Sequence, residues 1–301
     1  MKRSQRLPFG MLFCIIALIV PANSLQAQNE LEDSIEQLNS ETVTGYLQPF
    51  LDGFGANLNS GFTGTAKIEN KLVIRLEAVG MATLIGSAEE TFSTLPPAPF
   101  SQQPVEAATI FGDQGATVTG PEGLQYKFQN GVFDLDYFPL AVPQLTIGNF
   151  YHTQLQVRYA GYSGSDDVPE VQLIGLGVRH GLNQYFGELP VDVAAGVSYQ
   201  QLDIGDIMQT RAFAITGMAS KEFGILTVYG GAQYEKTQLD LNYTYTGAAD
   251  IENAEIDLSF DGENTIRGFA GLGVNLAVVH IRTDINLGNV TVLSASIGFG
   301  I

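Results

Sequence analysis

The sequence is short of cysteine, tryptophan and histidine. Of its 301 residues only one is cysteine, Cys14, none is tryptophan and three are histidine. Cys14 lies inside the N-terminal leader described below, so the mature chain offers no disulfide, no thiolate metal site and no cysteine nucleophile.

Positive charge is also scarce. The chain has 14 basic and 32 acidic side chains. Removing residues 1–27 removes Lys2, Arg3 and Arg6 but no acid, which leaves 11 basic against 32 acidic groups and a net charge of −21. Phosphate binding needs clustered lysine and arginine, so we expect no nucleic-acid partner.

Long hydrophobic runs are absent beyond the leader. Lys2, Arg3 and Arg6 precede the apolar run 11–20, and the small, turn-prone segment 21–27 follows it. This order predicts a secretory signal peptide over residues 1–27, with cleavage after Ala22 as an alternative. No later apolar run is long enough for a transmembrane helix. The mature protein is therefore periplasmic, secreted, or an outer-membrane β-barrel.

From about residue 72 onward the hydrophobic pattern has period two. In residues 279–287 the odd positions are almost all aliphatic, and the even positions are polar or charged. A strand places successive side chains on opposite faces, so each such segment has one apolar and one polar face. The same alternation is found in residues 154–159, 174–179, 191–200, 226–235, 266–275 and 293–301.

Two all-β architectures give this pattern: a soluble sandwich with the apolar face inside, and a membrane barrel with that face toward lipid. Three features favour the barrel. The strands are about ten residues long, tyrosine and phenylalanine lie near strand ends, and the polar faces carry isolated charges of both signs. The candidate lumen-lining residues are Arg75, Glu77, Arg158, Arg179, Asp192, Glu235, Arg267, Arg282 and Asp284.

The connections alternate between short and long. Short ones are expected at 181–190, 221–224 and near Ala277, and longer or acidic ones at 86–123, 163–170, 203–208 and 246–264. Short periplasmic turns and longer outside loops alternate in this way in outer-membrane barrels. Counting 61–68 and 124–133 as uncertain strands, we predict a transmembrane antiparallel β-barrel of about 12 strands.

The segment before the barrel has a different pattern. Apolar spacing in 31–38 and 44–54 predicts short helices, and 55–67 is rich in glycine and small residues. We therefore divide the chain into a signal peptide (1–27), an N-terminal helical segment (28–60) and an outer-membrane barrel (61–301). The N-terminal segment is either a plug in the lumen or a periplasmic helix leading into the first strand. A plug would place residues 46–62 against inward side chains such as Arg75 or Arg282.

Some motifs resemble a known family. Tyr46-Leu47-Gln48-Pro49-Phe50-Leu51-Asp52-Gly53-Phe54-Gly55-Ala56-Asn57-Leu58-Asn59-Ser60-Gly61, followed downstream by residues 175–180 and 189–192, looks like a family of outer-membrane proteins that has only a domain-of-unknown-function label. In architecture the chain is also similar to long-chain fatty-acid transporter barrels, which have an N-terminal hatch before the first strand. The resemblance implies location and fold, and it transfers no ligand-binding residue.

Catalytic and metal-binding patterns are weak. His152, His180 and His280 are far apart, and the serine near Gly161 lies in a broken nucleophile motif. The acidic segments 165–167 and 250–263 have no calcium-loop spacing, so we interpret them as solvated loops. We predict no enzyme activity, no metal site and no cofactor.

The sequence therefore predicts an integral protein of the cell outer membrane, in contact with outer-membrane lipid. The leading hypothesis is a channel or transporter for small or hydrophobic solutes. The alternatives are a surface-exposed binding or structural protein with a closed barrel as anchor, and a lipid-modifying enzyme.

Overall fold

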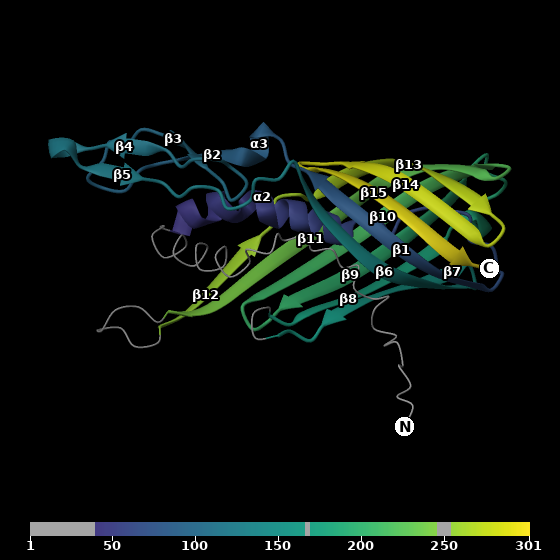
Figure 1. The fold of residues 1–301 in the computed structure, drawn as a ribbon. Helices are drawn as coiled ribbons and strands as arrows, with labels where there is room; N and C mark the ends of the chain where they lie inside the picture. Colours follow the sequence, from purple (N-terminus) through teal and green to yellow (C-terminus); the bar gives the residue numbers. More distant parts are fainter. Residues whose placement is uncertain (1–39, 166–168, 246–253) are drawn as a thin grey trace, which may run out of the picture.

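The computed structural model describes residues 40–165, 169–245 and 254–301 (Figure 1). The helix predicted over 31–38 and the acidic residues 246–253 lie outside these ranges. The barrel-wall strands are β1 (Val73–Leu84), β6 (Tyr137–Phe150), β7 (Thr153–Tyr162), β8 (Val171–Gly181), β9 (Asp192–Ile204), β10 (Met208–Phe223), β11 (Leu226–Tyr245), β13 (Ile266–Leu276), β14 (Val279–Leu287) and β15 (Thr291–Gly300). The remaining elements are α2 (Ser40–Asn59), α3 (Ser87–Glu90), β2 (Thr91–Thr94), β3 (Val105–Ala108), β4 (Thr117–Thr119), η2 (Pro121–Gly123), β5 (Gln125–Lys127), η3 (Asn183–Tyr185) and β12 (Ala254–Asp261).

These ten long strands form a closed antiparallel barrel. Neighbouring strands pair in the order β10-β9-β8-β7-β6-β1-β15-β14-β13-β11, and pairing of β10 with β11 closes the ring. The predicted count of 12 is wrong. Residues 61–68 are extended but join no strand ladder, and within 124–133 only β5 pairs, with β4 in the long loop. β12 pairs only with the far half of β11 and lies outside the closed ring.

The period-two pattern sets which side chains point inward. Along β14, Arg282 and Asp284 are buried, whereas Ile281 and Ile285 remain 43% and 40% exposed. On β8, Leu176 is 51% exposed. A sandwich would bury this aliphatic face between two sheets, so the structure excludes that alternative. The barrel instead turns its aliphatic face outward and its polar face inward.

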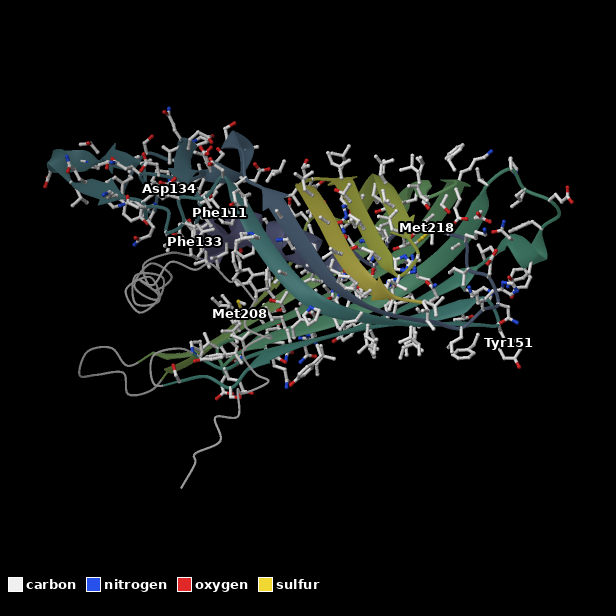
Figure 2. The ribbon with its side chains drawn as sticks, turned by 45° about the vertical axis from the view of Figure 1, so that its right-hand side comes forward. Phe111, Phe133, Asp134, Tyr151, Met208 and Met218 are labelled. Atoms are coloured by element: carbon white, nitrogen blue, oxygen red, sulfur yellow. The ribbon has the colours of Figure 1, made fainter. Side chains whose placement is uncertain are left out.

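The two ends of the barrel differ. At one end the strands are joined by short connections, such as Tyr151-His152 and Gly224-Ile225, and the chain ends there. At the other end, residues 85–136 form a lobe that carries β2 to β5 and projects beyond the wall (Figure 1). Met208 lies toward this long-loop end and Met218 toward the short-turn end of the same strand, as Figure 2 shows. Within the described residues, no helix is long and apolar enough to cross a membrane.

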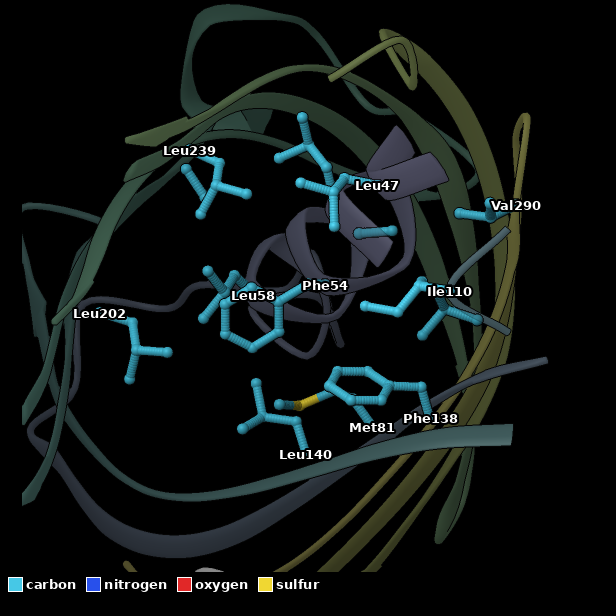
Figure 3. Close-up of a cluster of buried hydrophobic side chains, with 14 of the residues drawn as sticks. Leu47, Phe54, Leu58, Met81, Ile110, Phe138, Leu140, Leu202, Leu239 and Val290 are labelled. Atoms are coloured by element: carbon cyan, nitrogen blue, oxygen red, sulfur yellow. The ribbon is translucent and has the colours of Figure 1, made fainter. Parts of the chain in front are cut away.

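The N-terminal segment runs through the barrel interior. Helix α2 begins beside the lobe at the long-loop end and extends into the ring of strands (Figures 1 and 3). The chain then continues in extended form past Phe62 and Ala66, both buried, and reaches β1 at the short-turn end. The C-terminal part of α2 and residues 60–68 therefore lie inside the ring of strands.

Candidate functional site in the barrel interior

The interior has two layers. Toward the long-loop end, apolar side chains of helix α2 pack against apolar side chains of the wall (Figure 3). The apolar layer includes Leu47, Leu51, Phe54, Leu58, Met81, Phe138, Leu140, Leu173, Leu202 and Leu239. Toward the short-turn end the wall presents arginine, glutamate and glutamine side chains instead, which we call the polar layer.

The polar layer begins where helix α2 ends. The last four carbonyl groups of a helix have no partner within the helix and must be satisfied from outside when buried. Arg267 Nη1 donates to the Ala56 carbonyl at 2.9 Å, and Arg158 Nη1 donates to that of Leu58 at 3.2 Å. Gln233 Nε2 donates to the Asn59 carbonyl at 3.2 Å.

The remaining carbonyl, that of Asn57, accepts from the Ser60 amide at 3.0 Å. All four backbone carbonyl groups at the C-terminal end of the helix are therefore satisfied inside the barrel. Two guanidinium groups also meet the negative end of the helix dipole, which is a favourable arrangement.

The extended segment after the helix is held in the same way. Arg282 donates to the Thr63 carbonyl, Arg179 Nη1 donates to that of Thr65 at 3.4 Å, and the Ala66 amide donates to Ser220 Oγ at 2.8 Å. These contacts come from three different strands. They fix the main chain of this segment, so its position depends little on its own small side chains.

Phe62 fixes the register of this segment against the wall. The Arg158 guanidinium lies over the Phe62 ring, 3.7 Å from its centre, in a cation–π contact. The opposite edge of the ring lies against Gly177, where a Cβ atom would be 2.8 Å from the nearest ring carbon. Only glycine at position 177 leaves room for this ring.

Two buried ion pairs lie in the polar layer. Arg282 contacts Glu77 at 2.6 Å, and Arg267 contacts Glu235 at 2.8 Å. Glu77 also accepts from Thr146 Oγ1 at 2.9 Å. Further partners of this kind are what a buried pair needs to offset its desolvation.

Arg158 and Arg179 are buried without a carboxylate within 4.0 Å in the described part of the chain. Both donate to neutral oxygens: Gln144 Oε1 accepts from Arg158 Nε at 2.9 Å, and Gln154 Oε1 accepts from Arg179. The remaining acid, Asp284, accepts from Tyr229 Oη at 2.8 Å and from Thr63 Oγ1 at 3.3 Å. The interior is therefore richer in cations than the acidic chain as a whole.

The structure brings most of the nine candidate lumen residues together. Seven are buried in the interior: Glu77, Arg158, Arg179, Glu235, Arg267, Arg282 and Asp284. Arg75 is half-buried next to Gly298, nearer the short-turn end. Asp192 is half-buried at the short-turn rim, where it accepts from Asn183 Nδ2 at 3.3 Å, and it does not join the polar layer.

Sequence reasoning missed the neutral members of the layer. Gln144, Gln200 and Gln233 are buried and bridge the arginines or the helix end. Their signal was their place on the polar face of each strand, in register with the charged positions.

The part of helix α2 nearer the long-loop end is anchored to the long loops. Tyr46 Oη donates to the Asn130 carbonyl at 2.9 Å, and burial raises the pKa of Tyr46 to about 12. Asp52 Oδ1 accepts from the Glu263 amide at 2.7 Å and from Gln48 Nε2 at 3.2 Å. Burial raises the pKa of Asp52, against the lowering effect of these hydrogen bonds.

An apolar cavity of about 410 Å³ lies in the apolar layer beside helix α2. Phe50 and Phe54 of the helix form one side, and Leu173, Leu202 and Met208 of the wall form another. The rest of the lining comes from β6, residues 132–135, Ala160, Val171 and Ile204. The volume falls in the range of sites that hold small molecules, and almost all lining side chains are apolar.

The three histidines do not converge. Nδ1 of His152 lies 2.8 Å from the Ile68 carbonyl, that of His180 lies 2.8 Å from Thr153 Oγ1, and that of His280 lies 2.8 Å from Asn275 Oδ1. Among the residues described, no three histidine, cysteine or acidic side chains gather as a metal site would require. Each of these histidines has a local hydrogen-bonding role.

Comparison with known proteins identifies a family. A family model described as a family of unknown function (DUF6588) matches residues 1–301. This confirms the resemblance seen in the sequence. Comparison with curated proteins finds no relative.

Solved structures with some similarity are outer-membrane proteins. The outer-membrane protein OmpT of Vibrio cholerae is 10% identical, with 76% of this chain and 99% of that chain covered and a TM-score of 0.27. The translocator domain of the autotransporter NalP from Neisseria meningitidis is 11% identical, with 94% and 99% covered and a TM-score of 0.28. A FadL homologue of Pseudomonas aeruginosa is 10% identical, with 85% and 97% covered and a TM-score of 0.25. Likeness at this level transfers no function.

Proposed function

The chain belongs to DUF6588, a family of unknown function, and we propose that it is an outer-membrane β-barrel that binds and passes a small hydrophobic solute without catalysis or cofactor. The signal peptide predicted over 1–27 would direct it to the periplasm, and barrel 61–301 would then insert in the outer membrane. The outward aliphatic face supports this location, because a closed barrel satisfies its backbone in lipid.

We propose that residues 28–60 act with the following extended chain as a plug. The support is the filling of the interior by residues 40–68 and the contacts of the polar layer with their main chain. The buried arginines would then hold the plug, and they would line a polar path only when it moves.

The apolar cavity is the observation that supports a hydrophobic solute as the ligand. A cavity of about 410 Å³ lined by phenylalanine and leucine does not solvate ions, so a water-filled ion channel does not require it. Such a lining favours a ligand that is itself apolar, because burying its surface away from water is favourable.

Equilibrium dialysis with radiolabelled n-dodecanol tests the proposal. Detergent-solubilised protein should bind the alcohol above the detergent background. Leu202→Trp replaces a leucine side chain in the cavity by the larger indole ring and should weaken dodecanol binding at least tenfold. Leu176→Trp, the same change on the outer face, should leave binding unchanged. Binding that is absent, or equal in the two variants, would contradict a solute site here.

A second function is favoured by a specific observation. The Arg158 guanidinium and the Phe62 ring fill the centre of the polar layer, as expected of a closed barrel that anchors the loop lobe 85–136 for surface binding. Planar-bilayer conductance separates the two functions. Transport predicts currents that rise when residues 28–60 are deleted, and no current in either form favours the anchor.

A further inference from the structure

The barrel wall is incomplete between β6 and β7. The paired residues of these strands run from Phe150–Thr153 to Gln144–Arg158 and stop there. Beyond that point, residues 137–143 of β6 pair only with β1, and residues 159–162 of β7 pair only with β8. Near the long-loop end, the neighbouring wall strands β6 and β7 thus have no ladder between them.

The sequence of β6 explains this break. Pro139 and Pro143 lie within the unpaired part of the strand. Proline has no N–H to donate to a ladder, so within sheets it is confined to edges and bulges. Two prolines four residues apart leave β6 with an edge on this side, although it is a wall strand by position.

The apolar cavity lies behind this break. Its lining includes Leu140 and Val142 from the β6 side and Ala160 and Leu173 from the β7–β8 side, so it extends across the gap in the ladder. On the outer face, a hollow of about 700 Å³ lies on the β1 side of β6, over β1, β6, β15 and residues 134–136. It shares Asp134, Leu135, Pro139, Leu140 and Ala141 with the cavity lining, so these residues lie between the two.

The surroundings of the break place it at one edge of the outward apolar band. On the β6 side the outward neighbours are apolar, with Ala82 opposite Pro139 and Leu293 opposite Ala82. On the β8 side the exposed Ile174 is followed, two residues nearer the long loops, by Gln172. Tyr137 and Tyr159, 54% and 55% exposed, lie on either side. Tyrosine at such a boundary is typical of a membrane interface.

We propose that the break between β6 and β7 is a lateral window that connects the apolar cavity to the hydrocarbon of the membrane leaflet on the long-loop side. The occupant is a small apolar molecule dissolved in that leaflet, because the cavity lining is apolar apart from Asp134, and the outward side chains on the strands beside β6 are apolar below the exposed Asp134 and Asp136. Such a molecule moves between cavity and lipid without crossing the polar layer below. This inference rests on the proposed membrane location, and it holds whether or not solute is carried further.

Tryptophan fluorescence in vesicles tests the window, since the chain contains no tryptophan of its own. Leu140→Trp and Leu173→Trp place a reporter on either side of the break. Met218→Trp places one inside the barrel behind the fully paired β9–β10–β11 wall, and Leu176→Trp places one on the outer face. Each variant is reconstituted in phosphatidylcholine vesicles whose acyl chains carry bromine, a contact quencher. Heat-modifiable migration on a detergent gel verifies folding.

We expect quenching of L140W, or of L173W should L140W not fold, at least three times that of M218W and approaching that of L176W. Quenching of both window reporters no stronger than that of M218W would overturn the window. No solute is present, so the result is independent of dodecanol binding. A barrel that binds dodecanol but shields both reporters loses the window and keeps the proposed function.

Discussion

Asp52 is the one carboxylate on the buried part of helix α2, and it links the helix to the loop after β12. Asp52 is 8% exposed, and its carboxylate accepts a hydrogen bond from the Glu263 amide at 2.7 Å. Burial raises the pKa of Asp52 in the folded protein. Its contribution to stability is then complete below the unfolded pKa of about 3.9 and is lost as pH rises through the raised folded value.

Asp52→Asn should keep the acceptor oxygen and remove the charge. We expect the variant to be as stable as the wild type or more so at pH 7, and to lack the loss of stability that the wild type shows as pH rises above the unfolded value of about 3.9. Asp52→Ala leaves the Glu263 amide without a partner and should cost about 1–3 kcal/mol. Urea unfolding in vesicles from pH 4 to pH 8 measures this. A variant D52N as destabilised as D52A would show that the charge itself is required.

Arg158 joins three parts of the polar layer. It donates to the Leu58 and Ser60 carbonyls at 3.2 and 2.8 Å and lies over Phe62. Arg158→Met should therefore lower the free energy of unfolding by at least one charge-assisted hydrogen bond, about 1.5–3 kcal/mol. Arg211→Met is the control, because Arg211 is 41% exposed in its pair with Asp240 and such pairs contribute about 0–1 kcal/mol. Equal urea midpoints for the two variants would contradict the role of Arg158.

Residue-level reasoning predicted the direction of the charges but not their partners. The alternation in 279–287 put Arg282 and Asp284 on one face, and both are buried. The Arg282–Glu77 pair joins residues on β14 and β1, strands that do not adjoin. Such a contact depends on how the ring closes, and no local pattern contains that information.

At the scale of elements, the contact between β8 and the extended segment constrains where the N-terminal chain lies. Gly177→Ala brings a methyl group within 2.8 Å of the Phe62 ring. Phe62 is 5% exposed and held by Arg158, so we expect overpacking to cost about 1–3 kcal/mol. In the double variant Phe62→Ala/Gly177→Ala the Gly177 change should cost almost nothing. A double-mutant cycle from urea unfolding gives this coupling, and additive effects would place the ring elsewhere.

Elements were predictable where the period-two signal was long and failed where it was short. The wall strands β7, β8, β9, β11, β13, β14 and β15 coincide with the alternating segments, whereas β6 and β10 lie outside them and 61–68 was counted toward the barrel. Its small residues fit a strand as well as an extended chain held by side chains, and only the arginines distinguish the two. The prolines at 139 and 143 were a readable signal of an edge in β6, a strand that the alternating pattern did not include.

At the scale of the whole molecule, charge is sorted by location. The chain carries a net charge of −18, yet the polar layer contains Arg158, Arg179, Arg267 and Arg282 against Glu77, Glu235 and Asp284. The acidic excess therefore lies outside the polar layer. The cations inside face main-chain carbonyl groups, which a different N-terminal segment of similar shape would also present. This arrangement holds the main chain of the N-terminal segment inside the ring, with Phe62 as the side chain that the wall contacts most specifically.

The path of the chain predicts which end faces outward. Helix α2 starts at the long-loop end, so residue 44 should lie on the same side of the membrane as the lobe, and Lys71 on the other. Thr44→Cys, Glu122→Cys and Lys71→Cys introduce the only cysteine of the mature chain. In intact cells a membrane-impermeant maleimide should label T44C and E122C, and K71C only after the outer membrane is permeabilised. If T44C, like K71C, were labelled only after permeabilisation, the N-terminal segment would not thread the barrel in the cell.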